Sequence, residues 1–393
     1  MAGESRGYRT ALAQAKKVVL KVGTRVLVDS RGRPSDERFQ ALVDQIADLT
    51  KKGITPVLVT SGAVGAGMQA LGWTSRPTDL HDLQMAAAVG QSRLMSRYES
   101  LFARHGLVVG QVLLTADDLK NRTRHLNARN TLNNLLRHGV IPIINENDVV
   151  SVNEIKVGDN DMLAALTSIL VDADLLVLLT TTNGLKRMGV SESGRKTSKR
   201  IPYVERVTRD VLKLAGGKGS ELSTGGMASK LQAAALAARA GVCVVIGDGR
   251  NNNTVQRLLM GDDVGTLIGA ADNFSVVGDR GKKRWLAFFH RTRGAIVIDD
   301  GAVRALEERQ KSLLPVGVLK VEGSFGVGEL VSVRCRQGRL IARGLTEFDS
   351  ELILKIKGRK TGEITEVAGI NSSGEVIHRD NLVILRSKHG DVA

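Results

Sequence analysis

Apolar and polar positions alternate along this chain in two different ways. Over the first 270 residues, short apolar runs rich in Val, Leu and Ile are separated by longer segments in which apolar residues recur at helical spacing. The runs predict strands at residues 18–22, 54–60, 107–115, 140–145, 175–180 and 242–246. The longer segments predict helices at residues 39–49, 83–102, 124–137, 162–170 and 228–240. This order predicts an α/β domain whose mostly parallel sheet is sandwiched by helices.

The pattern changes after about residue 270. Residues 270–283 form a polar stretch that contains Gly and Asp, and we expect the domain boundary there. Beyond it, tight glycine turns separate short strands predicted at residues 330–336, 339–343 and 382–385, with one short helix at 301–311. This succession of short strands and tight turns is typical of a small β-barrel. We therefore predict two domains, residues 1–275 and residues 281–393.

Composition limits the location and the chemistry of the protein. Aromatic residues make up 3% of the chain, so the core should consist of aliphatic side chains. The N-terminus has no apolar stretch of signal-peptide length, and no window approaches the roughly 18–20 apolar residues of a membrane span. The two cysteines form no C-x-x-C pair, which disfavours a zinc site or a disulfide framework. We expect a cytoplasmic protein that does not act on membranes.

The formal net charge of +15 has two interpretations. It can attract anionic nucleotides, or it can contact nucleic acid through a basic surface. The excess is spread along the chain, so charge alone does not separate these alternatives.

Glycine-rich segments occur where predicted strands end or helices begin, which is where α/β sheets bind ligands. Three of them are candidates for anion binding: Lys21-Val22-Gly23-Thr24, residues 60–67 and residues 223–230. Glycine lets the backbone approach an anion, a helix N-terminus favours negative charge, and Lys21 and Lys230 add ammonium groups. Ordinary turns and capped helices are the alternatives. Because P-loop, dinucleotide and protein-kinase motifs are absent, a nucleotide site here must be of another type.

Acids and amides form a second kind of cluster. The sequence N-E-N-D at residues 145–148 ends a predicted strand, and K-V-G-D-N-D follows at residues 156–161. An Asx-rich turn that caps the next helix is one interpretation. The other is a site for a zwitterionic substrate, because carboxylates and amides can receive its ammonium group.

These segments together resemble the amino acid kinase family, and within it the glutamate 5-kinases. The resemblance runs through residues 21–24, 59–63, 88–93, 110–115, 126–129, 144–148, 155–161, 225–227 and Lys230. Its most specific parts are I-N-E-N-D at residues 144–148 and K-V-G-D-N-D at residues 156–161. Residues 313–318, 325–329 and 341–344 resemble a PUA domain, a small pseudo-barrel found in RNA-modifying enzymes.

The resemblance implies ATP-dependent phosphorylation of the γ-carboxylate of L-glutamate, the first step of proline biosynthesis, with feedback inhibition by proline. Lys21 and Lys230 would contact the phosphates as catalytic residues, and Asp161 would hold both lysines. Ser61, Asp148 and Asn160 would bind glutamate. The residues that would bind ATP are Lys21, Thr180, Thr181, Thr224, Gly225, Gly226, Met227, Ala228, Ser229 and Lys230.

The resemblance also implies the partners. Mg²⁺ is expected between the ATP phosphates, bound mainly through them and not through a metal site of protein side chains. A carboxylate acceptor is already ionised at pH 7, so no general base is required, and we assign no histidine to catalysis. The family suggests a homo-oligomer, a dimer or a tetramer, and the PUA-like domain suggests RNA as a ligand.

The sequence departs from the family after residue 185. Members often have an acid at the position of Thr181, and a Tyr and an Asp-Pro shortly beyond Leu185. Here a basic, Ser-rich stretch runs to Arg200, and we expect a mobile loop there. The alternative functions are another kinase of the same fold, acting on acetylglutamate, aspartate or UMP, and an RNA-binding protein that has lost its activity.

Overall fold

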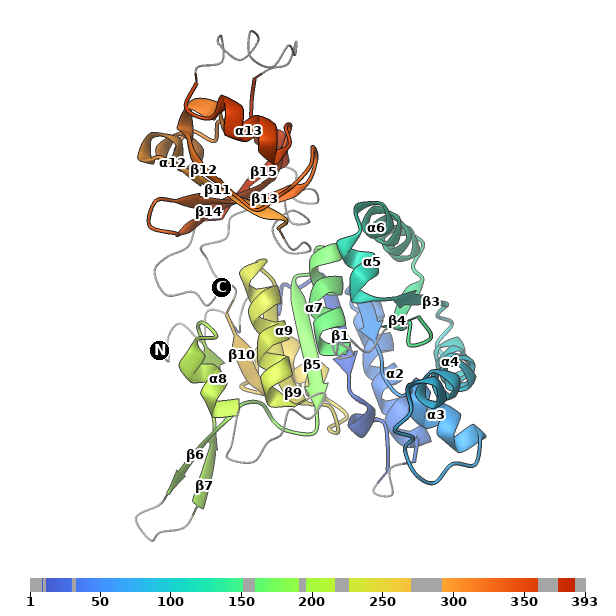
Figure 1. The fold of residues 1–393 in the computed structure, drawn as a ribbon. Helices are drawn as coiled ribbons and strands as arrows, with labels where there is room; N and C mark the ends of the chain where they lie inside the picture. The colour runs from blue at the N-terminus through green and yellow to red at the C-terminus, as the bar shows by residue number, and fades with distance from the viewer. Residues whose placement is uncertain are drawn as a thin grey trace. The chain divides into compact units, whose positions relative to one another are not determined.

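The computed structural model describes residues 9, 12–29, 33–150, 160–190, 196–215, 226–269, 292–359 and 374–385. The chain divides into two compact units, residues 1–271 and residues 272–393 (Figure 1). Each unit has its own sheet and its own core of buried, mainly aliphatic side chains. No helix in these described ranges is long and apolar enough to cross a membrane.

The first unit is built on an eight-stranded sheet in the order β3-β4-β2-β1-β5-β9-β10-β8. Its strands are β1 (Lys17–Val22), β2 (Thr55–Val59), β3 (Val109–Leu114), β4 (Ile141–Glu146), β5 (Leu175–Thr180), β8 (Tyr203–Val204), β9 (Cys243–Asp248) and β10 (Thr266–Ile268). Neighbouring strands are parallel, except that β10 runs antiparallel to β9. The predicted α/β architecture is therefore confirmed.

Helices cover both faces of this sheet. They are α2 (Asp36–Lys51), α3 (Ala63–Ala70), α4 (Leu80–Ala103), α5 (Ala116–Lys120), α6 (Arg122–Arg137), α7 (Asn160–Leu170), α8 (Arg209–Ala215), α9 (Met227–Arg239) and α10 (Thr254–Leu259). Because successive side chains of a strand point to opposite faces of the sheet, β1 contributes side chains to the helical layers on both faces. Leu20 belongs to the core that contains Ile46 of α2, whereas Lys21 reaches Asp161 of α7.

Helices α3 and α4 touch through their backbones. A Cβ atom added to Gly67 would lie 1.8 Å from the carbonyl oxygen of Ala86, and one added to Gly90 would lie 1.8 Å from that of Ala63. Helix α3 begins after Gly62, whose φ of 113° is in the left-handed region that favours glycine. The α3–α4 contact therefore fixes where the Ser61–Gly62 turn lies.

The structure has strands where a loop was expected after residue 185. Residues Lys186–Val190 and Lys196–Arg200 form the antiparallel strands β6 and β7 of a two-stranded sheet, with Lys186 opposite Arg200. Arg200, at the foot of this hairpin, forms a two-pronged ion pair with Asp263, with distances of 2.7 and 3.0 Å. A short basic strand pair was missed because it lacks the apolar alternation by which strands are recognised.

The second unit has a five-stranded sheet in the order β12-β11-β13-β14-β15. Its elements are β11 (Gly294–Ile298), α12 (Asp300–Glu307), β12 (Val318–Glu322), β13 (Leu330–Cys335), β14 (Leu340–Leu345), α13 (Ser350–Ile356) and β15 (Leu382–Ile384). Neighbouring strands are antiparallel, apart from the parallel pair β11 and β13. The predicted helix at 301–311 is shorter than expected, and α13 was not predicted.

Candidate functional site

A cleft of about 540 Å³ opens where β1, β2, β4 and β5 of the first unit end. Eight predicted site residues line it: Lys21, Ser61, Asp148, Asn160, Thr180, Thr181, Gly226 and Lys230. Gly226 is the residue that precedes α9. Segments that lie far apart in the sequence therefore meet at the sheet edge where ligands were expected.

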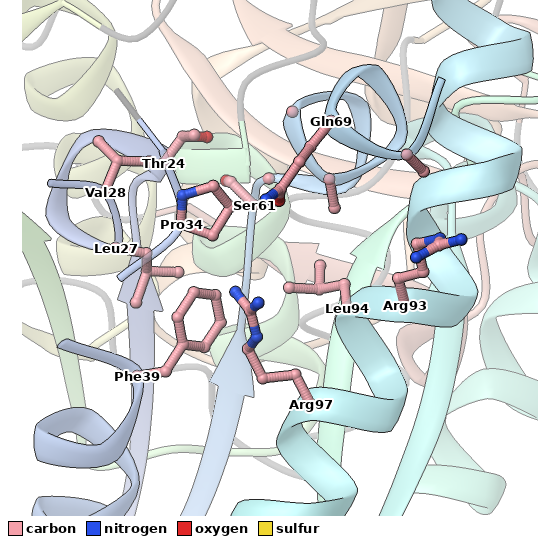
Figure 2. A pocket seen from close by; sticks show the side chains of 14 residues that line it. Thr24, Leu27, Val28, Pro34, Phe39, Ser61, Gln69, Arg93, Leu94 and Arg97 are labelled. Atoms are coloured by element: carbon pink, nitrogen blue, oxygen red, sulfur yellow. The ribbon is translucent and has the colours of Figure 1, made fainter. Parts of the chain in front are cut away.

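A second cavity of about 440 Å³ borders the Ser61–Gly62 turn (Figure 2). Thr24, Ser61, Gly62 and Gly65 line both this cavity and the cleft. The turn therefore borders both hollows, and a ligand in either of them would contact it.

A buried carboxylate holds two lysines at the floor of the cleft. Asp161, in the first turn of α7, is 0% exposed, and its two carboxylate oxygens lie 2.7 Å from Lys21 Nζ and 2.7 Å from Lys230 Nζ. Burial alone would raise the pKa of Asp161, but the two ammonium groups outweigh it and hold this pKa below its usual value. The group therefore carries two positive charges and one negative charge, and its net charge of +1 faces an anionic ligand.

The positions of the two lysines follow from the elements that carry them. Lys21 is the fifth residue of the buried strand β1, and Lys230 is in the first turn of α9, which follows Gly226. The first backbone N–H groups of a helix have no partner inside the helix, so this end of α9 also favours an anion. Charge and backbone donors thus converge on the same part of the cleft.

Amide groups form an ordered chain beside the lysines. Asn160 Nδ2 donates to the backbone oxygen of Thr60 at 2.8 Å, to Ser61 Oγ at 2.8 Å and to Asn145 Oδ1 at 3.0 Å. Asn145 Nδ2 then donates to Gln91 Oε1 at 2.8 Å. Because the carbonyl of Thr60 can only accept, it fixes the orientation of each amide along the chain. Ser61 Oγ accepts one of these bonds, which leaves its own proton free for a ligand in the cleft.

Asp148 supplies a different kind of carboxylate. It lies half-buried in the cleft, and burial raises its pKa, an effect that the charge of Arg76 opposes. An ammonium group bound beside Asp148 would offset the cost of burying this charge. The cleft therefore has a cationic floor at Lys21 and Lys230, and a carboxylate that suits a cation.

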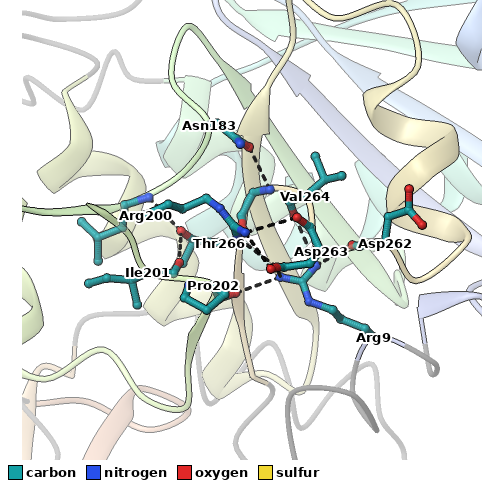
Figure 3. Close-up of polar contacts among 11 residues, drawn as sticks. Arg9, Asn183, Arg200, Ile201, Pro202, Asp262, Asp263, Val264 and Thr266 are labelled. Carbon is teal, nitrogen blue, oxygen red and sulfur yellow. Dashed lines mark hydrogen bonds and ion pairs between the residues drawn. The ribbon is translucent and has the colours of Figure 1, made fainter. Parts of the chain in front are cut away.

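The segment that follows Thr180 and Thr181 is held by a cluster of polar contacts around Asn183 and Thr266 (Figure 3). Asn183 Oδ1 accepts the N–H of Gly265 at 2.9 Å, and the N–H of Leu185 donates to Thr266 Oγ1 at 2.8 Å. The buried guanidinium of Arg9 joins the same cluster through Asp263 at 2.8 Å. The loop before β10 is thus tied both to the segment after β5 and to Arg9 in the N-terminal part of the chain.

The other residues predicted to bind the nucleotide are not among the described lining residues of the cleft. Met227, Ala228 and Ser229 form the first turn of α9 behind Gly226 and are not among the lining residues. Thr224 and Gly225 lie outside the described residues.

Some lining residues were not predicted from the sequence. Arg25 and Arg76 line the cleft, yet both come from short connecting segments where an arginine carries no distinguishing pattern. Asn145 was recognised only as part of an acidic and amide cluster, because hydrogen bonding between Asn145 and Asn160 depends on the tertiary structure.

Comparison with known proteins identifies the fold that carries this site. The model of the amino acid kinase family matches residues 16–248, which include every lining residue of the cleft. The chain belongs to the amino acid kinase family. The PUA domain model matches residues 294–368, so we call the two units the kinase unit and the PUA unit.

Relatives of this family member match along almost its whole length. A glutamate 5-kinase of Moorella thermoacetica is 47% identical over 380 residues, which are 97% of this chain and 99% of the relative. One of Caldanaerobacter subterraneus subsp. tengcongensis is 46% identical over 94% of this chain and 98% of its own. One of Chromohalobacter salexigens is 45% identical over 98% of this chain and 100% of its own. The similarity thus spans both the kinase unit and the PUA unit.

Proposed function

We propose that this protein transfers the γ-phosphoryl group of ATP to the side-chain carboxylate of L-glutamate, giving L-glutamyl 5-phosphate and ADP. The observation that carries this proposal is the Lys21–Asp161–Lys230 group beside Ser61 and Asp148. It joins a cationic floor suited to a transferring phosphoryl group with an acid suited to an amino-acid ammonium. The similarity to glutamate 5-kinases over 97% of the chain supports this choice of acceptor.

The chemical step requires positioning and charge neutralisation. A carboxylate oxygen of glutamate forms a bond to the γ-phosphorus, and the bond from that phosphorus to the ADP oxygen breaks. The acceptor is already ionised at neutral pH, so no proton has to be removed. Lys21 and Lys230 are held near the floor of the cleft by Asp161 and would stabilise negative charge on the transferring group.

The acceptor would lie between the amide chain and Asp148. Ser61 can donate its hydroxyl proton to a carboxylate, because Asn160 already donates to its oxygen at 2.8 Å. Asp148 would pair with the α-ammonium group. Both roles require an acceptor with an anionic and a cationic end.

The nucleotide would bind along Thr180, Thr181 and the start of α9 at Gly226. The side chains that line the cleft include only one carboxylate, Asp148, and three acidic ligands for a metal are not clustered in the described ranges. Mg²⁺ would therefore be held mainly by the ATP phosphates, where it would neutralise their charge.

The proposal extends to regulation, location and partners. We propose feedback inhibition by proline, a cytoplasmic location, homo-oligomerisation through the kinase unit, and RNA as a ligand of the PUA unit. The PUA family match supports the last of these.

The test is ATP turnover by the purified protein with Mg²⁺, trapping the acyl phosphate as a hydroxamate. Aspartate, N-acetylglutamate and UMP are run beside glutamate. We expect turnover with glutamate alone, reduced by added proline. Turnover with another acceptor would reassign the substrate. A folded protein that binds ATP but turns over none of these would favour an RNA-binding role without kinase activity.

A further inference from the structure

The cavity that borders the Ser61–Gly62 turn has its own chemistry. Leu27, Val28, Pro34, Phe39 and Leu94 give it an apolar lining. Arg93 and Arg97, one turn apart on α4, also line it, and the guanidinium group of Arg97 lies over the Phe39 ring. Among the described residues that line this cavity there is no acid. A hollow of this kind suits a ligand with a hydrocarbon body and one negative charge.

Arg97 is placed to receive such a charge. Its side chain rises from α4 between Phe39 and Leu94 (Figure 2), and its guanidinium carbon lies 5.0 Å from the centre of the Phe39 ring. Arg97 Nε lies 3.4 Å from Asp36 Oδ1, and the Asp36 side chain is 86% exposed. A surface pair of this kind is weak, so a bound carboxylate can compete for the guanidinium.

The charges around the two hollows disfavour an amino acid in the second one. The cleft holds Asp148, which suits an ammonium group, whereas the described lining of the second cavity has arginines and no acid. Asp36, which pairs with Arg97, lies outside that lining and is 86% exposed, so a zwitterion would bury its ammonium group at a cost. The ligand should therefore be a carboxylate that carries no ammonium group.

We infer that this cavity is a binding site for a small apolar carboxylate, distinct from the cleft and coupled to it through the Ser61–Gly62 turn. The coupling follows from the shared lining, since Thr24, Ser61, Gly62 and Gly65 line both hollows. The contact of α3 with α4 at Gly67 and Gly90 strengthens this coupling. A ligand that shifts α4 would either break this contact or move α3, and the Ser61–Gly62 turn precedes α3. By linkage, such a ligand and the acceptor change each other's affinity by the same factor.

Binding is tested first, by ligand-observed NMR titration of the full chain with 3-methylbutanoate. We expect a Kd on the order of 1 mM, which is reasonable for a ligand of so few atoms. The matched probes are 3-methylbutanol, which has the same hydrocarbon body without the charge, and leucine, which adds an ammonium group. We expect both to bind at least about tenfold more weakly. Equal binding of the alcohol, or tighter binding of leucine, would overturn the proposal.

The site is located with variants. Arg97→Gln should weaken binding of 3-methylbutanoate about tenfold or more. Arg104→Gln, at the end of the same helix and outside the cavity, is the control and should leave binding unchanged. Gln69→Trp fills the cavity from an exposed position and should abolish binding even if Arg97→Gln fails to fold. Unchanged binding in folded Gln69→Trp would overturn the assignment.

The coupling is tested separately, and this part rests on the proposed function. Saturating 3-methylbutanoate should change the KM for glutamate at least about threefold and leave the KM for ATP unchanged. Displacement of the bound carboxylate by glutamate would mean that it occupies the cleft, and would overturn the proposal. Because binding is measured without turnover, the absence of kinase activity would contradict the proposed function and leave the binding result standing.

Discussion

Asp161 is the residue on which the charge balance of the cleft depends. Its carboxylate is fully buried and shared by two ammonium groups. Breaking a buried ion pair by removing one partner is strongly destabilising, because the remaining charge is left unpaired. In this case two charges would be left.

Asp161→Asn should lower the free energy of unfolding by about 3–5 kcal/mol at pH 7. The pKa of Asp161 is lowered in the folded state, so its stabilising effect is complete above the unfolded pKa of about 3.9 and is lost as pH falls through the lower folded-state value. Urea unfolding from pH 7 to pH 3 should therefore show the difference from wild type shrinking below about pH 4. Asp210→Asn, which removes an exposed partner of Lys213, is the control. A difference that does not vary with pH would contradict the ionised state of Asp161.

Lys230→Ala should lower kcat by about 10²–10³-fold and change the KM for glutamate much less. The reason is that the ammonium group acts on charge that develops during transfer. The measurement is steady-state hydroxamate formation over a range of glutamate concentrations. An effect confined to KM would argue against this role.

At the scale of elements, the position of the Ser61–Gly62 turn depends on the contact between α3 and α4. Gly67 and Gly90 let the two backbones approach so closely that a methyl group on either would overlap a carbonyl oxygen. Gly65, in the same helix α3, has nothing within 4 Å of its added Cβ. The two kinds of glycine therefore predict opposite effects of substitution by alanine.

Gly90→Ala should destabilise the protein by about 1–3 kcal/mol and raise the KM for glutamate, because α3 must move away from α4. Gly65→Ala should instead stabilise it by about 0.5–1 kcal/mol through helix propensity. Thermal unfolding of both variants, with glutamate saturation curves, checks the pair. Similar losses of stability in both variants would count against the close contact.

The limits of prediction also appear at this scale. The strand at 175–180 was predicted to the residue, and α2 and α4 within a few residues, because their apolar spacing is regular. The β6–β7 hairpin was missed because its sequence is basic and lacks the apolar alternation by which strands are recognised. The hydrogen-bond chain from Gln91 through Asn145 to Asn160 could not be predicted either, because it joins the side-chain amides of three elements that meet only in the folded chain.

At the scale of the whole molecule, the cleft belongs to one unit. Its lining residues run from Lys21 to Lys230, within residues 1–271. The PUA unit has its own buried core, which includes Ile296, Val333 and Ile353. Nothing in the proposed chemistry requires a side chain from the PUA unit.

A fragment that lacks residues 281–393 should therefore retain measurable turnover of glutamate. The measurement is the hydroxamate assay, with circular dichroism to show that the fragment is folded and the full chain as reference. Complete loss of activity in a folded fragment would mean that the PUA unit takes part in the reaction.

The alternation of side chains in β1 has a consequence for how the gene can change. Leu20 belongs to the core with α2, and Lys21 turns to Asp161 on α7, so odd and even positions of this strand have unrelated tasks. Inserting or deleting one codon before Lys21 would exchange the two faces, placing an ammonium group among aliphatic side chains and a leucine at the floor of the cleft. Substitutions of Val18 or Leu20 by similar aliphatic residues would leave the alternation of side chains between the two faces unchanged. Variation in length should therefore be excluded from β1, even where variation in residue type is tolerated.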